Sequence, residues 1–287
     1  LLELNSNSLA VFLMVISVFI SLYAISKTGL DFSFEGASER RLDARRAFMP
    51  GAFTSYVLQA TMNTFTPILM FIFIRKGKFV HCIIPLGLSA LFFSLSGVKS
   101  IFLLVMLAGM FGYYDRKGRL PFVLKAILIA YFIIILVAAG ELYFLDYTYV
   151  GDYLLNRLFM KNALIQEFYF DLILNSNAIL SGHPNVTYLV GEQYFNNSLT
   201  NANTNGFLTS LAGKGLAIYI IELVVFSTII FIVDLLYRED RNTLWMLLIC
   251  LMTFLLVEQK LSVVLISSGI LIGLGLVFLM SNKNRKF

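Results

Sequence analysis

Charged residues are scarce in this sequence. They make up 14% of the 287 residues, against roughly a quarter in an ordinary soluble domain. Hydrophobic residues reach 59%, and the mean hydropathy is +0.82. This composition excludes a typical soluble domain and indicates an integral membrane protein.

Cysteine is almost absent. Cys82 and Cys250 both fall in apolar segments, which argues against a disulfide framework and against a cysteine-based metal site. The sequence also has no phosphate-binding glycine loop and no serine nucleophile elbow. The net charge of +5 is explained by juxtamembrane lysines and arginines that contact anionic lipid headgroups. Membrane lipid is therefore an expected partner, and nucleic acid is not.

Long apolar runs fill most of the chain. A helix needs about 20 apolar residues to cross the hydrocarbon core. We therefore predict an all-α membrane protein whose residues 1–287 form a single polytopic domain. Because the chain begins at Leu1 rather than at a methionine, we expect N-terminal spans to be missing from it. About eight transmembrane helices are predicted, near 7–28, 51–74, 79–96, 98–114, 121–143, 213–237, 242–258 and 261–280.

Four short basic segments set the expected orientation. They follow every second predicted span, at 75–78, 115–119, 238–241 and 282–286. Such segments all lie on one side of the membrane, and enrichment in lysine and arginine marks that side as the cytoplasm. Residues 144–206 then form one large loop on the opposite, outer side.

The large loop contains a segment with helical periodicity, 153–174. At about 100° per residue, Lys161 lies about 40° from Arg157, Asp171 about −40° and Glu167 about −80°. These four charges share one arc of an amphipathic helix, and apolar residues cover much of the rest. The helix would either roof a polar cavity or lie at the interface with its charges in water and paired one turn apart.

Cations gather on the predicted outer side. Arg40, Arg41, Arg45 and Arg46 lie in one short segment between two apolar runs. Lysine and arginine normally collect on the cytoplasmic side, so an outward cluster indicates an anionic ligand. Lys99, in a turn between two spans, lies at or just inside the outer membrane boundary. A cation at that depth costs a few kcal/mol unless it snorkels to the interface or binds an anion.

Polar residues also precede the sixth predicted span. Asn201, Asn203 and Thr204 lead into an apolar helix, and Lys214 lies between two glycines at its start. Amide side chains and free backbone N–H groups at a helix entrance can bind sugar hydroxyls or phosphate oxygens. The ordinary alternative is a helix N-cap with a polar approach.

Two further titratable residues stand out. His183 is the only histidine on the predicted outer side; it could act as a general base or be an ordinary solvated loop residue. Glu222 lies inside the sixth predicted span, where an acid is costly and usually has a partner. We expect a structural role for Glu222, with Lys99 or Lys214 as that partner.

The order of three motifs is informative. A Gly-x-Lys turn ends at Lys99, the large loop opens with Arg157-Leu158, and a polar approach leads to Lys214 between two glycines. Over roughly 97–222 this order resembles the Wzy-type O-antigen polymerases and is similar to the related O-antigen ligases, both bacterial glycosyltransferases of the GT-C class. The ligases carry a histidine–asparagine pair where this chain has 201–203. The histidine is missing here, which favours a polymerase.

The resemblance implies an enzyme in the bacterial inner membrane whose active face is periplasmic. It would transfer a growing glycan from undecaprenyl pyrophosphate to a repeat unit on a second lipid carrier. Its partners would be these lipid-linked oligosaccharides and a protein that regulates chain length. No metal or cofactor is expected, because cationic side chains can bind the pyrophosphate and stabilise the charge on its leaving oxygen.

The residues expected to act follow from this chemistry. One of Glu167, Asp171 and His183 would take the proton from the acceptor hydroxyl. The expected pyrophosphate-binding residues are Arg157, Lys99, Arg45, Arg46, Arg40 and Arg41. The expected substrate-binding residues are Asn201, Asn203, Thr204, Lys161 and Lys214.

Three other functions fit parts of the sequence. An O-antigen ligase is the nearest alternative. A transporter or flippase of lipid-linked oligosaccharide would tend to place broken helices and charges near the bilayer centre, whereas the charges here gather at the outer face. In a non-catalytic assembly partner, the arginines at 40–46 would only bind lipid headgroups.

Overall fold

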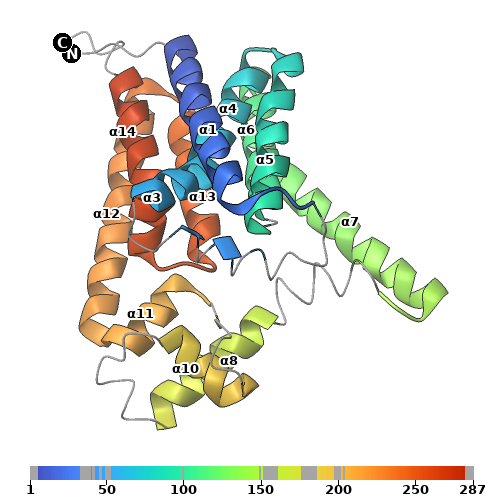
Figure 1. Cartoon of the computed structure of the whole chain (residues 1–287), viewed down its shortest axis with the longest axis vertical. Coiled ribbons are helices and arrows are strands. Elements are labelled where there is room, and N and C mark those ends of the chain that lie inside the picture. The colour runs from blue at the N-terminus through green and yellow to red at the C-terminus, as the bar shows by residue number, and fades with distance from the viewer. Residues whose placement is uncertain are drawn as a thin grey trace. The chain divides into compact units, whose positions relative to one another are not determined.

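The protein is all-helical (Figure 1). In this computed structural model, helices account for 86% of the described residues, and none of those residues lies in a strand. The structure describes residues 6–32, 40, 43–44, 47–48, 53–98, 100–148, 150, 161–175, 186–196, 202 and 204–281. The predicted all-α class is confirmed.

Helices lie within all eight predicted membrane segments. In chain order they are α1 (Ser6–Thr28), α3 (Phe53–Ala60), η1 (Thr61–Phe65), α4 (Thr66–Arg75), η2 (Phe79–Cys82), α5 (Ile83–Ser96), α6 (Ser100–Arg116), α7 (Phe122–Leu145), α8 (Lys161–Asn175), α10 (Val186–Phe195), α11 (Gly206–Lys214), α12 (Leu216–Asp240), α13 (Leu244–Leu256), η4 (Val263–Ser267) and α14 (Ile270–Ser281). Five stretches are long and apolar enough to cross a membrane: Ser6–Thr28, Phe53–Arg75, Phe79–Ser96, Lys125–Leu145 and Leu216–Asp240. By length and composition the chain is a membrane protein, and the count of eight spans stays a prediction.

The chain forms two compact units. Unit 1 comprises Leu1–Leu120, Ile230–Phe254 and Ser262–Phe287, and unit 2 comprises Pro121–Ile229 and Leu255–Leu261. Helix α12 contributes its first part to unit 2 and the remainder to unit 1.

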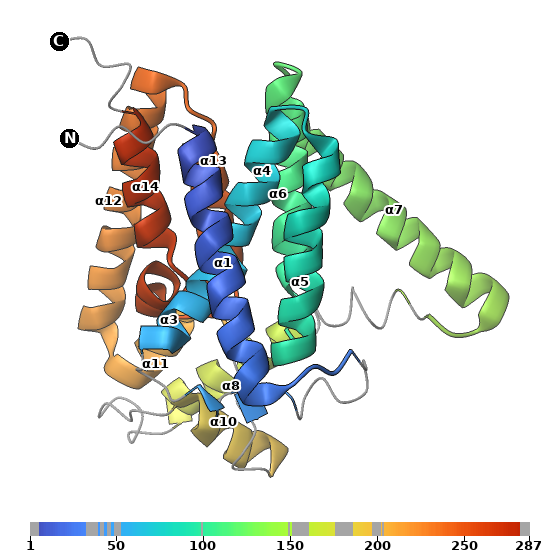
Figure 2. The same cartoon turned by 45° about the horizontal axis from the view of Figure 1, so that its top comes forward.

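Unit 1 is built around α4, whose residues from Thr66 to Phe73 are all buried. Helices α1, α5 and α6 pack against it (Figure 2). The α6 face toward α4 carries Gly109 and Gly112. A Cβ atom at Gly112 would lie 2.8 Å from the backbone oxygen of Phe71. Small residues thus allow the two backbones to approach closely, as in many membrane helix pairs.

Two π-helical turns interrupt the helices of unit 1. In η1, Asn63 Nδ2 donates to Ser268 Oγ at 3.2 Å and Thr64 Oγ1 donates to the backbone oxygen of Ser268 at 2.6 Å. The predicted span 261–280 is divided here into η4 and α14. Gly269 adopts φ +75°, and a Cβ atom on it would lie 2.4 Å from Ala60 Cβ. The break exists because the backbone at 268–269 must bend where it meets the π-helical turn.

The basic turns of unit 1 meet at one end. Arg75, at the end of α4, forms a 2.7 Å ion pair with Asp115 near the end of α6. The hydroxyl of Thr243, in the turn after α12, also bonds to Asp115. Lys76 Nζ donates to Asn7 Oδ1 at the start of α1, at 2.5 Å. The turns after α4, α6 and α12 therefore lie together, which agrees with the predicted alternation of spans; the fourth basic segment, 282–286, lies outside the described residues.

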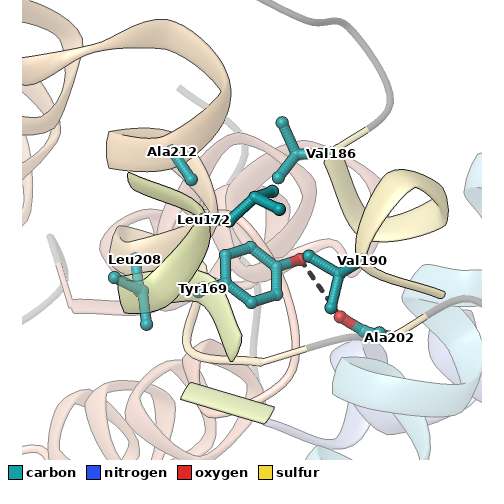
Figure 3. Close-up of a cluster of buried hydrophobic side chains, with 7 residues drawn as sticks. All are labelled: Tyr169, Leu172, Val186, Val190, Ala202, Leu208 and Ala212. Carbon is teal, nitrogen blue, oxygen red and sulfur yellow. Dashed lines mark hydrogen bonds between the residues drawn. The ribbon is translucent and has the colours of Figure 1, made fainter. Parts of the chain in front are cut away.

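Unit 2 holds a small apolar core made by α8, α10 and α11. Figure 3 shows this cluster, with the Tyr169 hydroxyl donating to the Ala202 backbone oxygen at 3.1 Å. Its buried members are Tyr169, Leu172, Val186, Val190, Ala202, Leu208 and Ala212. The segment predicted as the large loop is thus helical at α8 and α10. By contrast, only 6% of the apolar stretch in α7 is buried within the protein, which suits contact with lipid.

Candidate substrate site

Many of the predicted site residues lie outside the described part of the chain, and their roles stay predictions. For Lys161 the structure describes the backbone alone. The residues outside are Arg41, Arg45, Arg46, Lys99, Arg157, His183, Asn201 and Asn203. Arg40, Glu167, Asp171, Thr204 and Lys214 are described.

Arg40 is held within unit 1. Its Nη1 forms a 2.6 Å ion pair with Asp31, and its side chain is 10% exposed. The guanidinium lies 5.4 Å from the ring centroid of Phe93, in the last turn of α5. Because α5 leads away from the turn 76–78, Arg40 lies at the end of α5 opposite to the basic turns.

Asp171 and Glu167 are both exposed on α8. The Asp171 carboxylate bonds to the amide of Asn175 and to the hydroxyl of Tyr194. Tyr194 stacks on Phe168 with ring centroids 4.3 Å apart. Desolvation, together with Asp171, raises the pKa of Tyr194 to about 12. Asp171 thus joins α8 to α10, a structural contact, and neither carboxylate lies in a buried site.

The entrance to α11 is an N-cap followed by a close backbone crossing. Asn205 Oδ1 accepts a hydrogen bond from Phe207 N at 2.9 Å, so a helix cap is present at this polar approach. A Cβ atom at Gly206 would lie 2.0 Å from the backbone oxygen of Gln259. Only glycine permits this approach, which brings α11 against the turn 257–260.

The face of α11 that meets this turn is polar and buried. Ser210 lies one turn after Gly206 on the same side of the helix, and its side chain is completely buried. In the described part of unit 2, three buried side-chain oxygens have no hydrogen-bond partner: Thr204 Oγ1, Ser210 Oγ and Glu222 Oε2. A buried polar group without a partner costs about 1–3 kcal/mol, so three of them in one unit require an explanation.

Glu222 faces the protein from a helix that otherwise faces outward. It is 9% exposed, whereas Leu216, Ile220, Ile221 and Val224 around it are exposed. One turn further along α12, Phe226 contacts Phe207 of α11 at 5.4 Å between ring centroids. The side of α12 that carries Glu222 therefore lies next to the start of α11.

Lys260 lies within electrostatic range of both Lys214 and this acid. Burial lowers the pKa of Lys260, Lys214 lowers it further, and Glu222 acts in the opposite direction. We call Lys214, Glu222 and Lys260 the Glu222 cluster. Its three charges come from the end of α11, the second turn of α12 and the turn after α13. The cluster combines two lysines with one acid, and the helix that contributes Lys214 also carries the buried hydroxyl of Ser210. Lysines and hydroxyls suit a ligand that is anionic and rich in hydroxyls.

The sequence identified this cluster only in part. Lys214 was predicted to bind substrate, and Glu222 was predicted to be structural with Lys99 or Lys214 as its partner. Lys260 was missed, because a lysine in a short turn is ordinary on any membrane surface. The available signal was the acid inside an apolar span, which is a reason to look for a functional partner.

No protein family, curated protein or solved structure matches this chain.

Proposed function

We propose that this protein is a polysaccharide polymerase of the bacterial inner membrane, with about eight spans and a periplasmic active face. It transfers a growing glycan from undecaprenyl pyrophosphate to a lipid-linked repeat unit. The proposal rests on the order of sequence motifs that resembles the Wzy-type O-antigen polymerases.

One structural observation supports it above the others. The basic turns of unit 1 meet at one end, where Arg75 and Asp115 form their ion pair. Arg40 lies at the other end of α5, against Phe93. If the basic turns are cytoplasmic, as lysine and arginine enrichment favours, then the arginine segment 40–46 faces the periplasm, where lipid-linked glycans are polymerised.

The chemistry of the outward cations suits this reaction. A pyrophosphate leaving group gains negative charge on its oxygen as the glycosidic bond breaks, and arginine binds such oxygens bidentately. We assign this binding to Arg157, Lys99 and the arginines of 40–46. Stabilisation of developing charge by preorganised donors can contribute several kcal/mol to the rate.

A flippase for the same lipid-linked oligosaccharide is the second candidate, because one observation favours it. Asn63, Thr64 and Ser268 form a buried polar contact where two helices depart from α-helical geometry. Transporters often bind their substrate at such interrupted helices.

Deletion of the gene distinguishes these functions. The surface polysaccharide of the deletion strain is separated on a gel and compared with that of the parent and of the complemented strain. Collapse of the ladder to a single repeat supports the polymerase. Complete loss of attached glycan supports a flippase or a ligase, and an unchanged ladder contradicts all three.

A further inference from the structure

We propose that Glu222 is the catalytic base that takes the proton from the acceptor hydroxyl, with Lys260 within electrostatic range of its carboxylate. This inference rests on the proposed polymerase function. It assigns the base to a residue that the motif order does not indicate.

Burial is the first argument. A general base must lie where the acceptor hydroxyl can reach it and where bulk water does not compete. Glu167 and Asp171 are exposed, and the Asp171 carboxylate already accepts from Asn175 and Tyr194. Glu222 is 9% exposed, and its Oε2 has no hydrogen-bond partner among the described residues. It therefore has a free lone pair in a protected position.

Position along α12 is the second argument. Glu222 is six residues from the start of the helix at Leu216, which is about 9 Å along its axis. The basic segment 238–241 lies at the other end of α12 in the sequence. Glu222 thus belongs to the half of the predicted span that is further from this segment along the chain. In the proposed orientation this is the periplasmic half.

The surroundings of the carboxylate form the third argument. Lys260 lies within electrostatic range of the Glu222 carboxylate. The buried Ser210 Oγ and Thr204 Oγ1 also have no partner in the part of the chain that the structure describes. Hydroxyl groups of this kind bind the hydroxyls of a sugar. The acceptor sugar would supply the hydrogen bonds that these oxygens otherwise lack.

The transfer step then balances as follows. The acceptor hydroxyl gives its proton to the Glu222 carboxylate as its oxygen forms a bond to the anomeric carbon of the donor glycan. The bond between that carbon and the pyrophosphate oxygen breaks, and its electron pair leaves with the undecaprenyl pyrophosphate. The proton on Glu222 is released to solvent afterwards.

The test uses the full-length protein in the deletion strain, with the surface polysaccharide ladder and the amount of protein in the membrane as readouts. Glu222→Gln keeps the size and hydrogen bonding of the side chain but removes its basicity. We expect it to accumulate normally and to lose about 10² to 10⁴ in rate, so that the ladder collapses to single repeats. Glu239→Gln makes the same chemical change at an exposed position of the same helix, and we expect a normal ladder.

A second pair of variants covers the case in which Glu222→Gln fails to accumulate. Glu222→Asp and Glu222→Asn are nearly identical in size, so both carry the same packing defect, and only the aspartate can accept a proton. We expect a partial ladder with aspartate and single repeats with asparagine. Equal ladders from this pair, or a normal ladder from Glu222→Gln, would overturn the assignment while leaving the polymerase function intact. An unchanged ladder in the deletion strain would instead contradict the polymerase itself.

Discussion

Tyr169 shows how one buried side chain ties the stability of unit 2 to pH. Its side chain is fully buried among α8, α10 and α11, and its hydroxyl donates to Ala202. Burial raises its pKa to about 12, although a hydrogen bond with Thr209 partly offsets the effect. In the unfolded chain the phenol ionises near its ordinary value of about 10. The unfolded state therefore releases this proton first as the pH rises.

We predict that the Tyr169 contribution is fully present below about pH 10 and is lost between about pH 10 and pH 12. The total loss is on the order of 3 kcal/mol. Thermal unfolding in detergent, measured across this range, should show a shallower decline in Tyr169→Phe than in the native protein. Tyr143→Phe removes a hydroxyl from a residue that is 81% exposed and should follow the native curve. Parallel curves for native protein and Tyr169→Phe would contradict the prediction.

At the scale of single residues, the sequence indicates which side chains are unusual, but not which of them lie close together in the fold. It singled out Glu222, because an acid inside an apolar span is unusual whatever the fold. It could not associate Lys260 with Glu222, since their proximity depends on the crossing of α11 with residues 259–260. Among the candidate bases Glu167, Asp171 and His183 it favoured Glu167. The exposure of Glu167 and Asp171 is decided by how α8 packs on α10 and α11 and could not be predicted.

At the scale of elements, hydropathy located the helices and missed their interruptions. Apolar runs predict a span without regard to its neighbours, so 261–280 was expected to be one helix. Its division follows from the contact of Gly269 with Ala60, two residues far apart in the sequence. The π-helical geometry of η1 has the same origin, since Asn63 and Thr64 bond to Ser268 across the helix pair.

The crossing at Gly206 gives a prediction at this scale. A Cβ atom at Gly206 would lie 2.0 Å from a backbone oxygen, whereas one at Gly140 in α7 would meet nothing within 4 Å. Gly206→Ala must displace α11 from residues 259–260, and we expect it to cost about 1–3 kcal/mol. Gly140→Ala should be neutral or stabilise by up to about 1 kcal/mol, because alanine favours the helix.

Thermal unfolding of the two purified variants in detergent measures the difference. We expect a lower melting temperature for Gly206→Ala only, together with a weakened polysaccharide ladder, since α11 carries Ser210 and Lys214. Equal melting temperatures would mean that the backbone crossing does not constrain α11.

At the scale of the whole molecule, the proposed function depends on which side of the membrane each segment faces. The basic turn 117–119 and α10 are predicted to lie on opposite sides, the first cytoplasmic and the second periplasmic. Lys117 and Gln193 are exposed positions in these two segments. Each can therefore carry a reporter cysteine that a soluble reagent reaches from one side only.

We predict that Gln193→Cys reacts with a membrane-impermeant maleimide in intact spheroplasts, and that Lys117→Cys reacts only after lysis. Both variants are made in a background without Cys82 and Cys250, which are the only native cysteines, and an unsubstituted background controls for other labelling. The reverse pattern would place α10 and the arginine segment 40–46 in the cytoplasm, away from the lipid-linked glycans that the polymerase joins. Inversion would therefore contradict the polymerase proposal, because the arginines of 40–46 would then lie on the side of the membrane opposite to the lipid-linked glycans.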